Sequence, residues 1–182
     1  MKRVAVFFAD GFEEIEAVSI IDVLRRASLE VTTVSVTGNL QVTGSHNITV
    51  TADKVFESMD FSSFDMLVLP GGMPGAKNLN NHVALKKLIL QFNESGKNLG
   101  AICAAPLVFG QAGILKGKKA TCYPGFEEYL EGAEITGTSK EVAGNIVTGK
   151  GAGVAIEFAL QLVEILKDKK TAEELAIRMI AN

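Results

Sequence analysis

The sequence LGAICAAPLVFG, at residues 99–110, joins a short apolar run directly to a segment with helical spacing. Residues 99–102 have the length and composition of a buried strand, and residues 104–110 are expected to be helical. Cys103 lies at the junction among small residues, the arrangement of a nucleophile elbow, in which a sharp turn exposes the reactive side chain. Pro106 suits the first helical turn, because its missing N–H is not needed there. The stretch therefore predicts a buried strand that turns sharply into a helix at a cysteine.

The same alternation continues on both sides of this stretch. Strands are expected at residues 4–9, 31–36, 66–69, 119–122 and 145–148, a small hairpin at 41–51, and helices from about Glu13, at 83–92, at 154–167 and after a capping box of Thr171 and Glu174. Strands that are apolar throughout are covered by helices on both faces of a parallel sheet. The pattern predicts a three-layer α/β/α sandwich, and the length fits one domain spanning residues 1–182.

Composition restricts the class of protein. Hydrophobic residues make up 47 % of the 182 residues, which is enough for a core and excludes intrinsic disorder. The net charge of −3 argues against nucleic acid or an anionic membrane as the main partner. The first apolar run stops at Asp10, and no later run approaches the length of a membrane span. With only two cysteines, a disulfide framework is not expected, and we predict a cytoplasmic protein.

Reactive groups in such folds gather beyond the carboxyl ends of the strands. After residue 69 the chain reads Pro-Gly-Gly-Met-Pro-Gly, where glycines either direct N–H groups into a site or simply form a tight turn. The loop at residues 149–153, Gly-Lys-Gly-Ala-Gly, looks like a phosphate loop, but no βαβ unit follows it. Tight packing of a helix on its strand explains those glycines better, so we expect no cofactor.

The helix that follows the first strand carries glutamates on its apolar side. Glu13 and Glu16 each share a helical stripe with buried-type residues, and spacing does not choose between them. The helix is also apolar nearly all round, through Val18 and Ile21 among others. This favours burial of a second side, which indicates a homodimer formed through residues 13–26.

Metal binding and serine hydrolysis have little support. The histidines, His46 and His82, show no ligand-like spacing with Cys103 or Cys122, so no metal site is predicted. No serine occurs in a Gly-x-Ser-x-Gly context. On its loop alone, Cys103 is equally well interpreted as a reactive thiol or as an ordinary core cysteine.

Four motifs together resemble one family. They are GFEEIEAV at residues 11–18, VLPGGMPGAKNL at 68–79, GAICAAP at 100–106 and GKGAGVAIEFAL at 149–160. In this order and spacing they resemble the DJ-1/ThiJ/PfpI superfamily, on its DJ-1/ThiJ branch, from Val4 to at least Leu166. The resemblance implies a flavodoxin-like sandwich with a mostly parallel sheet, a homodimer and a reactive cysteine on the elbow.

The resemblance also assigns roles to individual residues. It implies that Cys103 is the nucleophile and that Glu16 is the carboxylate that hydrogen-bonds it. The backbone amides of Gly72 and Ala104 match those that stabilise an oxyanion. The periphery of the site then comprises Gly71, Gly75, Tyr123, Gly151 and Gly153, and Arg26 matches a basic position of the dimer interface.

Two departures from the family, and one contrast with its protease branch, bear on the chemistry. Tyr123 precedes Pro124 where better-known members often have a histidine, and a phenol cannot replace an imidazole near neutral pH. His46 occupies a position where arginine is frequent. Ala104 follows the cysteine, whereas in the protease branch a histidine does, so peptidase and amidotransferase activities are disfavoured.

The function that the resemblance implies is turnover of small aldehydes. We expect a glutathione-independent glyoxalase, converting methylglyoxal to lactate, or a related protein deglycase, with Cys103 as nucleophile and Glu16 as proton shuttle. The alternative is an oxidation sensor or stress chaperone that uses the same thiol. A third possibility is a member that has lost activity and is retained for binding.

Overall fold

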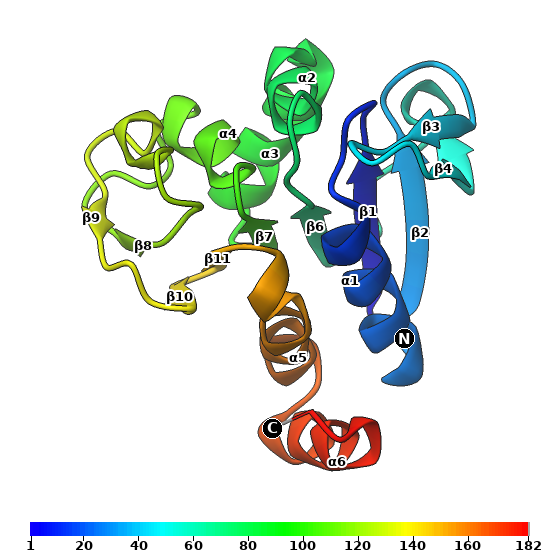
Figure 1. Cartoon of the computed structure of the whole chain (residues 1–182), viewed down its shortest axis with the longest axis vertical. Coiled ribbons are helices and arrows are strands. Elements are labelled where there is room, and N and C mark those ends of the chain that lie inside the picture. The colour runs from blue at the N-terminus through cyan, green and yellow to red at the C-terminus, as the bar shows by residue number, and fades with distance from the viewer. Residues whose placement is uncertain (182) are drawn as a thin grey trace.

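The computed structural model describes residues 1–181, so Asn182, the last residue of the expected domain, lies outside the described residues. A seven-stranded sheet with the order β10-β11-β7-β6-β1-β2-β5 forms the centre of the molecule (Figure 1). Its parallel strands are β1 (Arg3–Phe8), β2 (Glu30–Ser35), β5 (Lys54–Val55), β6 (Met66–Leu69), β7 (Asn98–Ile102) and β11 (Ile146–Gly149). The edge strand β10 (Lys140–Ala143) runs antiparallel to β11.

Helices cover both faces of this sheet. The connection from β1 to β2 moves toward one edge and that from β6 to β7 moves toward the other, so right-handed crossovers place their helices on opposite faces. One layer contains α1 (Glu14–Arg26) and α5 (Ala155–Leu166), with α6 (Lys169–Met179) packed on α5; the other contains α2 (Gly75–Asn81), α3 (Val83–Glu94) and α4 (Pro106–Gln111) (Figure 1). The predicted three-layer sandwich with a mostly parallel sheet is confirmed. Within residues 1–181, no helix is long and apolar enough to span a bilayer.

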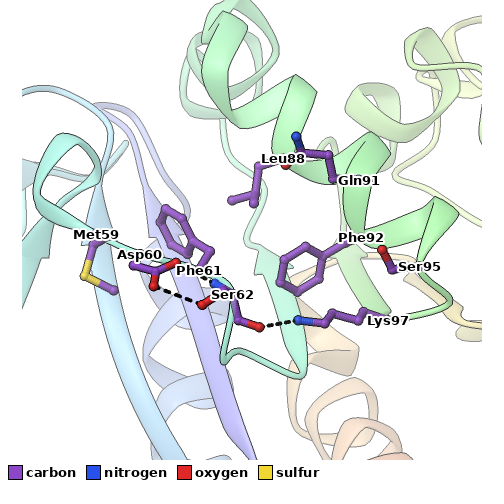
Figure 2. A pocket seen from close by; sticks show the side chains of 9 residues that line it. All are labelled: Met59, Asp60, Phe61, Ser62, Leu88, Gln91, Phe92, Ser95 and Lys97. Atoms are coloured by element: carbon purple, nitrogen blue, oxygen red, sulfur yellow. Dashed lines mark hydrogen bonds between the residues drawn. The ribbon is translucent and has the colours of Figure 1, made fainter.

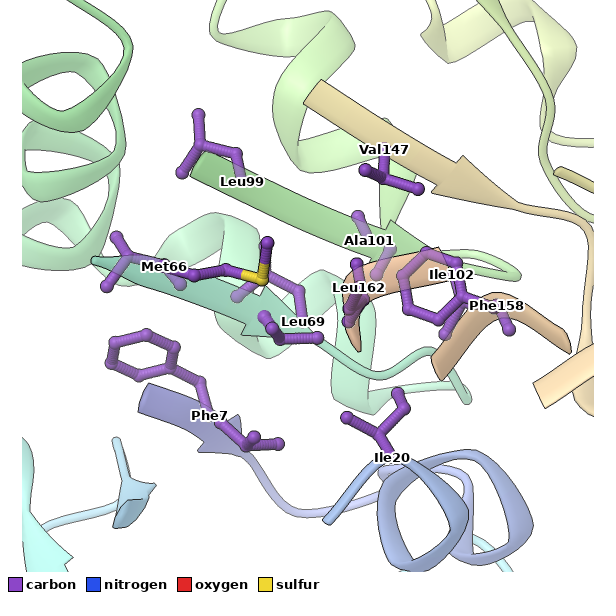
Figure 3. Packing of buried hydrophobic residues seen from close by; sticks show 14 of the residues in the cluster. Phe7, Ile20, Met66, Leu69, Leu99, Ala101, Ile102, Val147, Phe158 and Leu162 are labelled. Atoms are coloured by element: carbon purple, nitrogen blue, oxygen red, sulfur yellow. The ribbon is translucent and has the colours of Figure 1, made fainter. Parts of the chain in front are cut away.

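The core lies on both faces of the central strands. Every residue of β6 is buried, as continuous apolar strands require when two helical layers cover them. Figure 3 shows Ile20 of α1 and Phe158 and Leu162 of α5 packing toward the strands. This packing fixes the strand ends from which the loops of the site emerge.

Short elements complete the fold. The hairpin predicted at residues 41–51 is present as β3 (Gln41–Thr43) and β4 (Thr49–Thr51). The strand predicted at 119–122 is only β8 (Lys119–Ala120), which pairs with β9 (Glu134–Ile135) outside the main sheet. The 3₁₀ turns are η1 (Phe56–Ser58), η2 (Glu127–Tyr129) and η3 (Ala152–Val154).

The predicted start of the last helix is wrong. Asp168 is the N-cap of α6, and its Oδ1 accepts a hydrogen bond of 2.7 Å from the Thr171 N–H. Thr171 therefore lies inside the first turn and does not form a capping box with Glu174. The physical reason is that aspartate caps a helix at least as well as threonine, and an earlier start brings three more residues into α6.

Candidate active site

Three neighbouring strands deliver the predicted site residues to one place. Glu16 is on α1, which follows β1; Gly71 and Gly72 follow β6; and Cys103 follows β7. These three strands lie side by side in the sheet. The sheet reverses its direction of winding between β1 and β6, which is where doubly wound folds form their ligand sites.

Cys103 occupies a sharp turn between β7 and α4. Its φ is 64°, a left-handed conformation that is uncommon for any residue other than glycine. Two hydrogen bonds hold the residue: its N–H donates to the Gly149 carbonyl at 2.9 Å, and its carbonyl accepts from the Tyr123 N–H at 2.8 Å. Its exposed fraction is 9 %, so the residue is largely buried.

The two glycines after β6 leave room for the reacting groups. A Cβ on Gly71 would lie 2.6 Å from Cys103 Cβ and 2.9 Å from Glu16 Oε2, so no larger residue fits between the thiol and the carboxylate. Gly72 has a φ of 88°, which favours glycine. The backbone N–H groups of Gly72 and Ala104 both act to lower the pKa of the Cys103 thiol, so both favour negative charge at the sulfur.

Glu16 is the carboxylate beside the thiol. It is fully buried, and its Oε2 accepts a 2.7 Å hydrogen bond from the Gly71 N–H. Its Oε1 is buried with no hydrogen-bond partner of normal geometry among residues 1–181. Burial raises the pKa of Glu16 to about 7, against the opposing effects of the Cys103 side chain and the Gly71 N–H. Glu13, the alternative that spacing left open, instead caps α1 by accepting from the Glu16 N–H at 2.8 Å.

The surroundings of Cys103 favour a neutral thiol. Burial and the neighbouring Glu16 carboxylate raise the pKa of Cys103 to about 12, although the Gly72 and Ala104 N–H groups act in the opposite direction. The helix α4 begins only at Pro106 and spans six residues, so its effect at the sulfur is small compared with burial and with the adjacent carboxylate.

The peripheral residues are only partly brought together. Tyr123, Gly151 and Gly153 line one hollow of about 330 Å³, and a Cβ on Gly151 would lie 3.3 Å from the Tyr123 ring. Gly75 does not line this hollow, and its N–H donates to the Gly11 carbonyl at 3.1 Å. Arg26 pairs with Asp22 on the exposed side of α1, at 2.6 Å.

Glu14 is a structural residue that the sequence did not reveal. It is 6 % exposed, and its carboxylate accepts hydrogen bonds from the His46 N–H at 2.7 Å and from His46 Nδ1 at 2.8 Å. Burial acts to raise the pKa of Glu14, but the bonds from His46 and Ile48 outweigh it and lower that pKa to about 2. Among the described residues, Glu13, Glu14 and His46 bring possible metal-ligand atoms within 4.8 Å of one another. Both Glu14 oxygens, however, already accept hydrogen bonds from His46. Glu14 and His46 are 32 residues apart in the sequence, so no local motif predicts their contact.

The other cysteine and histidine have structural contacts. Cys122 is a free, buried thiol, and so is Cys103, so the two are not joined. His82 Nδ1 accepts from the Leu85 N–H at 3.1 Å and caps α3. Since His46 bonds Glu14, both histidines hydrogen-bond groups other than the Cys103 thiol.

A further hollow of about 390 Å³ lies at the opposite edge of the sheet, before β6 and β7 (Figure 2). Its polar groups bond to one another: Ser62 donates to Asp60, and Lys97 Nζ donates to the Ser62 carbonyl at 2.7 Å. Since catalytic groups of this fold gather at the carboxyl ends of the strands, this hollow is separate from the candidate site.

Comparison with known proteins agrees with this architecture. The structure titled Toxoplasma gondii DJ-1, oxidized, has a TM-score of 0.95 and 39 % identity, covering 99 % of this chain and 98 % of that chain. Protein DJ-1 homolog B of Arabidopsis thaliana is 42 % identical over 96 % of this chain, which spans only 40 % of that relative's length. A protein of Pyrococcus abyssi named as a deglycase is 32 % identical over 91 % of this chain and 99 % of its own length.

A family model gives the same assignment over most of the sequence. The model described as the DJ-1/PfpI family matches residues 2–165, which include all four sequence motifs and the three strand ends of the site. The chain belongs to the DJ-1/PfpI family.

Proposed function

We propose that the chain is a cysteine-dependent enzyme of small reactive carbonyl compounds. It converts methylglyoxal to lactate without glutathione and releases the same carbonyl group from glycated amines. The observation that carries the proposal is the buried Glu16 carboxylate beside the Cys103 thiol, with the Gly72 and Ala104 N–H groups directed at the same sulfur. The relative named as a deglycase supports the same class of chemistry.

The first step is attack by sulfur on the aldehyde. Ionised Glu16 accepts the thiol proton as the S–C bond forms, because the thiol does not ionise by itself near neutral pH. The oxyanion of the resulting hemithioacetal lies where the Gly72 and Ala104 N–H groups stabilise it, and the shuttled proton then neutralises it.

The second step moves a proton between adjacent carbons. Glu16 removes the C1 proton of the hemithioacetal, giving an enediol, and returns a proton to C2, giving the thioester of lactate. Water hydrolyses the thioester to lactate and regenerates the thiol, so one methylglyoxal and one water give one lactate. A glycated amine follows the same route, with the free amine leaving when sulfur takes its place on C1.

The test is lactate formation from methylglyoxal at several pH values. Because Glu16 must be ionised, kcat/KM of the wild type is expected to rise as pH passes through about 7. Cys103→Ser should form no lactate, and Glu16→Gln should lose about 10²–10⁴-fold in rate and the pH dependence near 7. Lactate formation by Cys103→Ser at the wild-type rate would overturn the proposal.

A second candidate function is oxidation sensing through the same thiol. Two N–H donors at the sulfur suit sulfinate oxygens, and Glu16, with a pKa of about 7, can donate a proton to them. A similar structure is titled as oxidized DJ-1. After mild peroxide, intact mass should show an addition of about 32 Da that is absent in Cys103→Ser. Oxidation of Cys122 ahead of Cys103 would contradict this role.

We also propose a homodimer formed through the outer side of α1. Ile15 and Val18 are 60 % and 51 % exposed, and Ile48 of the neighbouring hairpin is 56 % exposed. The Ile48 N–H lies 3.5 Å from Glu14 Oε1, so this hairpin residue adjoins the first turn of α1. These three residues form the α1 patch, and exposed apolar patches of this kind mark interaction surfaces.

A further inference from the structure

A second pocket lies between α2, α4 and η2, with a volume of about 300 Å³. Its apolar side is formed by Met73, Leu107, Phe126 and Tyr129. Lys77, Asn80 and Gln111 are among its polar groups. An apolar surface with a few polar groups opposite it is the usual composition of a small-molecule site.

The segments that line this pocket adjoin the candidate active site along the chain. Met73 directly follows Gly72, whose N–H acts to lower the pKa of the Cys103 thiol. Leu107 is in the first turn of α4, and its N–H donates to the Ala104 carbonyl at 3.2 Å.

The segment that supplies Phe126 to the pocket also contacts Cys103. The Phe126 ring packs edge-on against Tyr123, with centroids 6.4 Å apart, and the Tyr123 N–H donates to the Cys103 carbonyl. The segments that hold Cys103 in place therefore also supply the apolar residues of the pocket.

The pocket is not needed for the smallest substrate. Methylglyoxal has three carbons, and all of them react at or next to the sulfur. A cavity of about 300 Å³ is already in the range that accommodates a whole small ligand, so it suits the remainder of a larger substrate.

One polar atom of the pocket residues has no partner. Asn80 Nδ2 donates to Gln111 Oε1 at 2.7 Å, which fixes the side-chain amide. Asn80 Oδ1 is buried and accepts no hydrogen bond from any residue in the described range 1–181. A buried carbonyl oxygen of this kind calls for an N–H donor, which an amine or amide supplies.

We propose that this pocket binds the amine half of a glycated substrate. The occupant is an apolar amino-acid residue whose nitrogen carries the methylglyoxal adduct, with its side chain against Met73, Leu107 and Phe126 and an N–H donated to Asn80 Oδ1. The ammonium of Lys77 disfavours a cationic side chain in the same place. This inference rests on the proposed carbonyl chemistry at Cys103 and names the substrate class that distinguishes a deglycase from a simple glyoxalase.

Binding is tested without catalysis. L-phenylalaninamide, the amine product of such a substrate, should bind the wild-type chain saturably and shift the amide resonances of α2 and α4 in NMR spectra. Glycinamide, which lacks the phenyl ring, should bind at least about tenfold more weakly. Asn80→Leu, which removes the acceptor, and Gln111→Trp, which fills the pocket, should each weaken phenylalaninamide at least about tenfold.

The matched control is Gln91→Trp, the same exchange at the rim of the hollow in Figure 2, which should leave phenylalaninamide binding as in the wild type. Equal binding of glycinamide and phenylalaninamide would overturn the inference, and so would equal loss in Gln91→Trp and Gln111→Trp.

Turnover provides the second measurement. Lactate formation is followed from methylglyoxal alone and from methylglyoxal equilibrated with excess L-phenylalaninamide. In the wild type the adduct should add to the rate that free aldehyde supports; in Gln111→Trp the ratio of kcat/KM for adduct to that for aldehyde should fall about tenfold.

The two proposals fail differently. Absence of lactate from methylglyoxal and from the adduct would overturn the proposed function, while the binding result still decides whether the pocket takes an apolar amine. Turnover of methylglyoxal with no selectivity for phenylalaninamide would leave the function standing and overturn the pocket assignment.

Discussion

At the scale of single residues, the burial of Glu16 disfavours its ionised form. Burial raises its pKa from 4.5 to about 7. Between these values the folded chain keeps a proton that the unfolded chain has released, so the free energy of unfolding falls as pH rises through this window. The carboxylate that is proposed as the base therefore lowers stability at neutral pH.

Glu16→Gln should remove this pH-dependent cost. A shift of about 2.5 units corresponds to about 3 kcal/mol, so the variant is expected to gain that much relative to wild type between about pH 4 and about pH 8. Urea unfolding at several pH values measures it. Glu174→Gln, at an exposed site on α6, serves as the control, and a pH-independent difference between Glu16→Gln and wild type would contradict the argument.

Gly71→Ala tests the close approach at the site. Its Cβ would lie 2.6 Å from Cys103 Cβ, so the cysteine or the loop must shift. We expect a loss of about 1–3 kcal/mol in stability from overpacking and about 10²-fold in kcat/KM from displacement of the thiol. Thermal unfolding and lactate assays measure the two effects. Gly153→Ala is the control for thermal unfolding, because its Cβ meets nothing within 4 Å and its φ, like that of Gly71, lies outside the left-handed region.

At the scale of elements, apolar patterning predicted the strands well and helix ends less well. The continuous apolar run at residues 66–69 is β6 as predicted, because only a strand of that length is buried on both faces. The start of α6 was misplaced because Asp168 and Thr171 are both good N-caps, and the sequence does not say which one the chain uses.

Asp168→Ala is the prediction that belongs to this scale. Loss of the bond to the Thr171 N–H should lower the free energy of unfolding by about 1 kcal/mol. Glu174→Ala, the other member of the rejected capping box, is exposed and should change it by less than about 0.5 kcal/mol. A larger loss of unfolding free energy in Glu174→Ala than in Asp168→Ala, measured by denaturant titration, would instead support the capping box of Thr171 and Glu174.

At the scale of the whole molecule, the proposed dimer depends on the α1 patch. Val18→Lys places a charge in the centre of that patch and should convert the dimer to a monomer, because a two-fold interface repeats the charge. Light scattering after size-exclusion chromatography measures the mass. Ile177→Lys, at a residue of α6 that is 77 % exposed, is the control and should stay dimeric. A dimer that persists in Val18→Lys would place the interface elsewhere.

The sequence by itself determined the layered fold and the cysteine at the elbow, because hydrophobic periodicity and the junction of strand and helix are local properties of the chain. Local spacing left Glu13 and Glu16 equivalent, and the resemblance to a family favoured Glu16. The Gly71 N–H donates to Glu16 Oε2 next to Cys103, whereas Glu13 caps α1, so Glu16 is the one beside the thiol. Only the tertiary structure decided that the pKa values of that pair are raised and that Glu14 contacts the hairpin. Both depend on burial and on groups far apart in the chain, which no local pattern records.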